Sequence, residues 1–138
     1  IGVAQFDKLE LFIEKRRKNF FILKNKLEGL KKYFIFPKES KGAKPSWFGF
    51  PISIKNNSKV KRQEVLLKLN DKKIGTRLLF SGNLTKQPAY IGKKFRISGN
   101  LEKTDFVMQN TFWIGLYPGL GKEELSFVVK TLKNILRK

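Results

Sequence analysis

Hydrophobic residues recur at steps of three and four positions along the first thirty residues of the chain. Val3, Phe6, Leu9 and Ile13 begin this series, and charged residues stand between them. The spacing predicts one long amphipathic helix over residues 3–31. Helical spacing, or the alternation typical of strands, returns farther along the sequence. These later patterns predict helices over residues 60–73, 101–110 and 121–137, and strands over residues 47–54, 74–80 and 111–116.

Individual residues refine these boundaries. Ser58 precedes the second helix as a predicted N-cap, because its hydroxyl can accept a hydrogen bond from a free amide of the first turn. Pro51 lies within the first strand and indicates an edge position or a bulge, since proline has no amide hydrogen for strand pairing. The segment Tyr117–Gly119 predicts a turn before the last helix, and residues 81–99 predict an irregular loop.

The order of these helices and strands favours the α+β class. We expect a small, mainly antiparallel sheet with flanking helices and a long N-terminal helix. A length of 138 residues fits a single domain over residues 1–138. The sequence opens at Ile1 inside a helical pattern, with no capping residue before it. We therefore expect it to be a piece of a longer polypeptide.

The charge of the chain points toward polyanions at first. Lys and Arg number 30 against 11 Asp and Glu, which gives a net charge of +19, and a free-standing nucleic-acid-binding module is the alternative function. However, Lys, Asn, Ile, Phe and Tyr, whose codons are rich in A and T, make up 60 of the 138 residues. We interpret most of the positive charge as the result of an AT-rich genome, which encodes lysine often, and not as selection for binding a polyanion. The basic runs Lys15–Lys18 and Lys59–Arg62 are then expected to be solvated helix faces.

Missing residue types exclude several kinds of site. The chain has no histidine and no cysteine, so it cannot by itself form a Ser-His-Asp triad or a thiolate metal centre. We expect no catalytic, cofactor-binding or metal-binding residue within it. Its longest uncharged run, Phe106–Gly121, is too short and too polar to span a bilayer, so no membrane partner is expected. A hydrophobic content of 41% excludes a disordered basic tail.

Several segments together resemble one enzyme family. The opening IGVAQFDKL at residues 1–9, followed by IEKRR at 13–17, is similar to a helix of the DegT-type sugar aminotransferases. The same resemblance includes PSWFGFP at 45–51, IGTRLLFSGNLTKQP at 74–88 and NTFWIGLYPGL at 110–120. These enzymes depend on pyridoxal phosphate and have fold type I. The resemblance extends along the whole chain.

The segment 74–88 is the most specific of these. It resembles the dehydratase branch of the family, whereas the aminotransferases more often have a His-Tyr pair near Leu79 and Phe80. The resemblance implies the C-terminal small domain of a longer, cytoplasmic enzyme. That enzyme would remove the C3 hydroxyl of a CDP-4-keto-6-deoxyhexose for lipopolysaccharide deoxysugars. The residue at the Schiff-base lysine position is outside this sequence, so dehydratase and aminotransferase both stay open.

The resemblance also implies cofactors and partners. The intact dehydratase would be a homodimer that uses pyridoxamine or pyridoxal phosphate and a two-iron–two-sulfur cluster. A reductase would deliver the electrons, and a nucleotide sugar would be the substrate. All of this chemistry would lie outside residues 1–138, so we expect the isolated chain to bind neither cofactor and to be inactive.

Four residues are the candidates for contact with that substrate: Arg77, Phe80, Asn83 and Gln87. Arg77 follows a predicted strand, and its guanidinium could hold a phosphate or a sugar oxygen. Phe80 could stack on a ring, and the two amides suit sugar hydroxyls. The alternatives are a surface arginine, a core phenylalanine and amides that cap a loop. We expect Trp47 and Trp113 to belong to the core.

Overall fold

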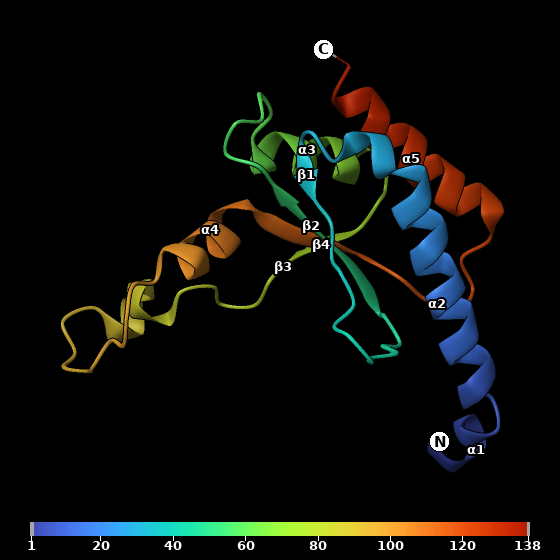
Figure 1. The fold of residues 1–138 in the computed structure, drawn as a ribbon, viewed down its shortest axis with the longest axis horizontal. Helices are drawn as coiled ribbons and strands as arrows, with labels where there is room; N and C mark the ends of the chain where they lie inside the picture. Colours follow the sequence, from blue (N-terminus) through green and yellow to red (C-terminus); the bar gives the residue numbers. More distant parts are fainter. Residues whose placement is uncertain (1, 138) are drawn as a thin grey trace.

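Four short strands pair into one antiparallel sheet in the computed structural model, which describes residues 2–137 (Figure 1). The strands are β1 (Phe34–Ile35), β2 (Gly49–Ile54), β3 (Thr76–Leu78) and β4 (Thr111–Gly115), in the spatial order β1-β2-β4-β3. The helices are α1 (Gly2–Phe6), α2 (Leu9–Lys26), α3 (Arg62–Asp71), α4 (Glu102–Asn110) and α5 (Lys122–Ile135). Short 3-10 turns cover Glu28–Leu30, Leu84–Lys86 and Pro88–Tyr90. The predicted α+β fold is therefore confirmed.

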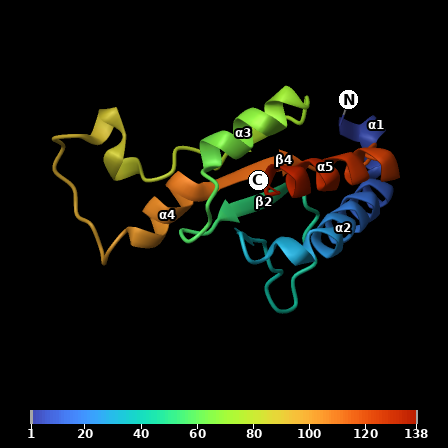
Figure 2. The same ribbon diagram turned by 90° about the horizontal axis from the view of Figure 1, so that it is seen from above.

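One face of the sheet is apolar and lies under helices. Along β2, Phe50, Ile52 and Ile54 are buried, while Pro51 and Ser53 between them are only half-buried. This period of two sends every second side chain to the core. Helix α5 packs against both α2 and α3, and Figures 1 and 2 show these three helices grouped away from α4. The buried apolar side chains of the other elements include Phe20, Leu23, Leu27, Val65, Leu69, Phe112, Ile114, Leu125 and Leu132.

The opposite face of the sheet carries Trp113. Its ring contacts Phe48 edge-to-face, with the ring centroids 5.2 Å apart. It also covers Gly49, where a Cβ atom would stand 2.6 Å from the indole. The expectation of a core position is therefore wrong for Trp113, which is half-buried on the second face. Trp47 does pack against the core, since it stacks on Phe20 at 4.4 Å, although it precedes β2 instead of lying within it.

The N-terminal helix is interrupted. Residues 7 and 8 form a turn between α1 and α2, and a 3-10 turn follows α2, so the prediction of one helix over 3–31 is wrong in detail. Val3 and Phe6 are 90% and 72% exposed. Burial along α2 begins only at Asn19 and Phe20. The first turns therefore lack the buried apolar stripe that would hold a longer helix straight.

Two of the boundary signals also fail. Helix α3 begins at Arg62, and the hydroxyl of Ser58 accepts instead from the amide of Val60 at 3.4 Å, within the turn before the helix. Pro51 lies in the interior strand β2 and not in an edge strand. It is tolerated because β1 pairs only with Ser53 and Ile54 and does not extend as far as the proline. The predicted turn at residues 117–119 is confirmed.

The buried ring of Phe112 offers a test of this core. Replacement by alanine removes a fully buried ring from β4 and should lower the free energy of unfolding by about 3–5 kcal/mol. Phe127 on α5, which is 48% exposed, is the matched control, and its replacement by alanine should cost about 1 kcal/mol or less. Urea denaturation followed by tryptophan fluorescence, from Trp47 and Trp113, measures both. Equal losses for the two variants would contradict the assignment of the core face.

Candidate functional site

Strand β3 places Arg77 on the face of the sheet that the helices leave open. It pairs antiparallel with β4, and Arg77 stands opposite Trp113 in the register. The Arg77 side chain is exposed, and it has no hydrogen-bond or ion-pair partner within residues 2–137. Its guanidinium is therefore available to an anionic group. The strand is shorter than predicted, since it covers 76–78 instead of 74–80.

The chain turns sharply where β3 ends. The amide of Phe80 donates to the carbonyl of Leu78 at 3.0 Å, which closes a three-residue turn. Phe80 has a φ of 50°, a left-handed conformation that is rare for a bulky residue, and its ring is 88% exposed. Such strain costs about 1–3 kcal/mol and persists only where the surroundings impose it. Phe80 is therefore not a core residue.

Asn83 does not face solvent. It is 2% exposed, and its side-chain oxygen accepts from both the amide (3.1 Å) and the hydroxyl (2.7 Å) of Thr85. The Gln87 amide is half-buried and donates to the carbonyl of Ser81 at 2.6 Å. The structure thus places Asn83 and Gln87 in one loop with Phe80. However, both side-chain amides form hydrogen bonds with other groups of that loop. Direct contact with a ligand does not fit the burial of Asn83.

A residue that the sequence did not single out holds this loop. Asp105, on α4, accepts from the Asn83 amide at 2.7 Å through one oxygen and from the Lys86 ammonium at 2.8 Å through the other. Hydrogen bonds from Lys86 and then from Asn83 lower the pKa of the Asp105 carboxyl below its ordinary value. The group is therefore ionised at neutral pH and binds both donors as a carboxylate.

A close packing contact supports the same loop. Gly82 has a φ of 66°, and a Cβ atom there would overlap the side chain of Met108 on α4. The amide of the next residue, Asn83, points to the Met108 sulfur at 3.3 Å. Only glycine meets both the backbone angle and the space at position 82.

Arg62 fixes the point where α4 passes into β4. Its guanidinium donates to the carbonyls of Met108 and Thr111, the latter at 3.3 Å. Burial lowers the pKa of this guanidinium below its ordinary value, which still leaves it cationic. The expectation of a solvated basic run is thus wrong for Arg62, because its guanidinium donates hydrogen bonds to backbone carbonyls inside the fold.

A cavity of about 500 Å³ opens beside the Phe80 ring. Figures 1 and 2 show that the segment 79–101 leaves the sheet on the side away from α2 and α5, and the cavity lies where this segment meets α4. Its walls are mostly apolar, and Lys103 and Thr104 add polar groups. The lining residues are Leu79, Phe80, Ser81, Gly82, Leu84, Lys103, Thr104 and Val107.

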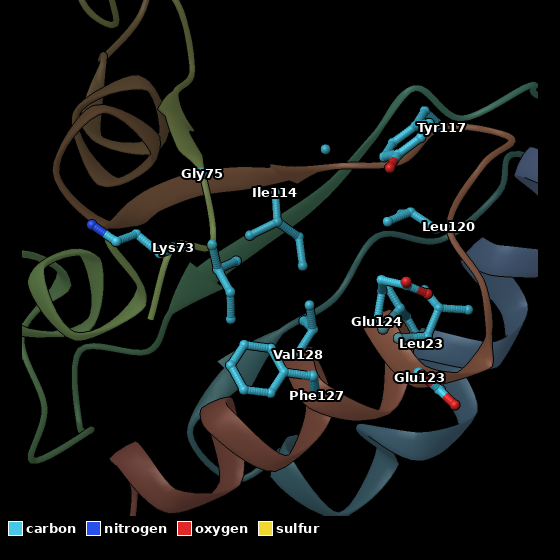
Figure 3. Close-up of a pocket in the computed structure, with 13 residues that line it drawn as sticks. Leu23, Lys73, Gly75, Ile114, Tyr117, Leu120, Glu123, Glu124, Phe127 and Val128 are labelled. Atoms are coloured by element: carbon cyan, nitrogen blue, oxygen red, sulfur yellow. The ribbon is translucent and has the colours of Figure 1, made fainter. Parts of the chain in front are cut away.

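A larger hollow of about 710 Å³ lies elsewhere, between α5, β4 and the segment of residues 73–75 that precedes β3. Ile114 from β4 faces Phe127 and Val128 from α5 across it (Figure 3). None of the four predicted site residues lines this hollow, and its walls are largely apolar. The four predicted site residues therefore lie apart from this hollow, at β3 and in the loop after it.

The part of the chain that the structure describes shows neither a metal centre nor a membrane helix. Within residues 2–137, no three His, Cys, Asp or Glu side chains come together as a metal-binding group. None of the helices in this part of the chain combines the length and hydropathy that a membrane span requires.

Comparison with known families decides the relationship. Residues 1–133 match the DegT/DnrJ/EryC1/StrS aminotransferase family. The chain belongs to this family. It is 47% identical over 128 residues to the lipopolysaccharide biosynthesis protein RfbH of Salmonella typhimurium. The matched residues make up 93% of the chain and 29% of that protein. A dTDP-4-dehydro-2,6-dideoxy-D-glucose 3-dehydratase of Saccharopolyspora spinosa is 35% identical and matches 100% of the chain and 30% of its own length.

Solved structures agree with this family assignment. The Escherichia coli GDP-4-keto-6-deoxy-D-mannose-3-dehydratase, solved with bound hydrated pyridoxal phosphate, superimposes with a TM-score of 0.85 at 26% identity. The match covers 95% of the chain and 33% of that structure. The chain thus spans about a third of the length of its relatives. The expected family and the small antiparallel sheet with flanking helices are confirmed.

The packing of Gly82 against Met108 gives a test of the loop. An alanine at position 82 would add backbone strain and a steric overlap, and should lower the free energy of unfolding by about 2–4 kcal/mol. Gly92 is the matched control, since it also has a positive φ, of 76°, but no atom lies within 4 Å of the point that a Cβ would occupy. Alanine there should cost about 1–2 kcal/mol. Equal losses in urea denaturation would contradict the close packing of loop and helix.

Proposed function

We propose that this chain is the C-terminal small domain of a nucleotide-sugar 3-dehydratase that depends on pyridoxal or pyridoxamine phosphate. The substrate would be a CDP-4-keto-6-deoxyhexose, and the pathway would supply deoxysugars for lipopolysaccharide. The observation that carries the proposal is the 47% identity to the Salmonella protein over 93% of the chain. Its three further curated relatives are all described as 3-dehydratases of nucleotide-linked sugars, which supports the dehydratase branch of the family.

The residues of this chain would bind and orient the substrate. Arg77 presents an unpaired cation on the open face of the sheet, where it would hold a phosphate or a sugar oxygen. Phe80 presents an exposed ring that would stack on the sugar or the base and exclude water from one side. Asn83 and Gln87 would act indirectly, because their amides maintain the loop that carries Phe80.

The iron–sulfur cluster does not fit the residues present here. An iron–sulfur cluster needs thiolate ligands, and the 138 residues contain no cysteine. We therefore assign the cluster to a part of the enzyme outside this chain. We propose that the pyridoxal phosphate site and the bond cleavage at C3 lie there as well. In the same proposal the intact protein is a cytoplasmic homodimer that receives electrons from a reductase.

The net charge of +19 is what favours the nucleic-acid-binding alternative, but part of this charge and several of the aromatic rings are used inside the fold. Arg62, from one of the basic runs, donates hydrogen bonds to the carbonyls of Met108 and Thr111. Phe20, Phe34, Phe50 and Phe112 are fully buried and cannot stack on bases.

Kinetics of the intact enzyme test the role of Arg77. Because a hydrogen bond to a charged group contributes about 1.5–3 kcal/mol, Arg77→Met should raise the KM for CDP-4-keto-6-deoxyglucose by about 10- to 100-fold. Arg77→Lys should restore part of the loss. Arg137→Met, an exposed position after α5, is the control and should leave the KM unchanged.

The product of the reaction tests the activity itself. A dehydratase releases a 3-deoxy sugar without added nitrogen, whereas an aminotransferase forms an amino sugar and consumes an amino donor. Release of an amino sugar by the intact enzyme would refute the dehydratase assignment. A KM that is the same for Arg77→Met and Arg137→Met would refute the proposed contact.

A further inference from the structure

The exposed ring of Phe80 needs an explanation. A phenylalanine that is 88% exposed and in the left-handed region is unfavourable in both its hydration and its backbone. The neighbouring cavity has apolar walls from Leu79, Leu84 and Val107, so the ring could bury itself there by a change of backbone angle. Some interaction must keep the loop from relaxing in that way.

The carboxylate of Asp105 is placed to do this. Its two oxygens accept from two different residues of the loop, Asn83 and Lys86, at 2.7 and 2.8 Å. Asn83 is itself held on its other side by the amide and hydroxyl of Thr85. The anchor therefore runs from α4 through two side chains into the backbone of the loop that begins with Phe80.

An acceptor-only group is required at this point. Both loop partners of Asp105 are donors, one an amide and the other an ammonium. An asparagine at position 105 would turn one of the two oxygens into a donor, which would face either the Asn83 amide or the Lys86 ammonium. It would therefore lose one of the two bonds while keeping the size of the side chain.

We propose that Asp105 is a positioning residue that holds the loop after β3 in the conformation that presents Phe80 to the nucleotide sugar. This inference rests on the proposed function for the identity of the ligand. Asp105 does not touch the ligand in this role. It acts through Asn83 and Lys86. Its carboxylate stabilises the loop conformation in which the Phe80 ring is exposed, relative to the one in which that ring is turned into the cavity.

The test uses the intact enzyme and the variant Asp105→Asn. Glu102→Gln is the matched control, since Glu102 is an exposed carboxylate of the same helix and has no hydrogen-bond partner within residues 2–137. Hydrogen–deuterium exchange without ligand should be about 10-fold or more faster over residues 81–87 in Asp105→Asn, with α5 unchanged. The KM for CDP-4-keto-6-deoxyglucose should rise about 10-fold or more, with a smaller change in kcat.

A second variant keeps the test decisive if Asp105→Asn does not fold. Lys86 is half-exposed, and Lys86→Met removes one of the two anchors without touching the core, so it should show the same changes to a smaller extent. Exchange and KM values equal to those of Glu102→Gln would overturn the inference. If the wild-type enzyme does not use the nucleotide sugar, the proposed function fails, and the exchange measurement alone still decides whether Asp105 anchors the loop.

Discussion

The antiparallel pairing of β2 with β4 is the interaction on which the rest of the structure depends. It runs from Gly49 opposite Gly115 to Ser53 opposite Thr111 and sets which side chains face the helices. A shift of one residue would send the whole apolar set to the open face. Strand β3 pairs with the other edge of β4 in its own register, which sets Arg77 opposite Trp113 and so on the face that Trp113 occupies. The exposure of the best candidate for ligand binding thus follows from the packing of the core.

The candidate site combines a rigid support with a strained loop. Helix α4 ends at Asn110, and β4 begins at the next residue, so the anchor at Asp105 is directly connected to the central strand. Arg62 holds the same junction through two carbonyls. In the proposed role of Asp105, the loop that carries Phe80 is thus held by a helix that is itself fixed to α3 and β4. A ring held in place before the ligand arrives loses less conformational entropy on binding.

The sequence predicted what depends on local patterns and missed what depends on distant partners. Alternation and helical spacing located β4, α4 and α5 to within about two residues, and in β4 and α5 the apolar faces are buried as the pattern requires. The break before α2 escaped prediction, since it depends on which apolar residues find a partner in three dimensions. Asn83 was correctly placed in a loop, but its burial depends on Asp105, which is 22 positions away in the sequence. Nothing local distinguishes Asp105 from any other charged helix residue.

The most direct measurement is fluorine NMR of the intact enzyme with 4-fluorophenylalanine at position 80. The account predicts a resonance typical of an exposed ring in the free enzyme, and a shift that saturates as CDP-4-keto-6-deoxyglucose fills the site. The half-maximal shift should fall near the dissociation constant measured by calorimetry on the same sample. A resonance that does not move when calorimetry shows the site to be full would contradict the claim that this loop presents Phe80 to the substrate.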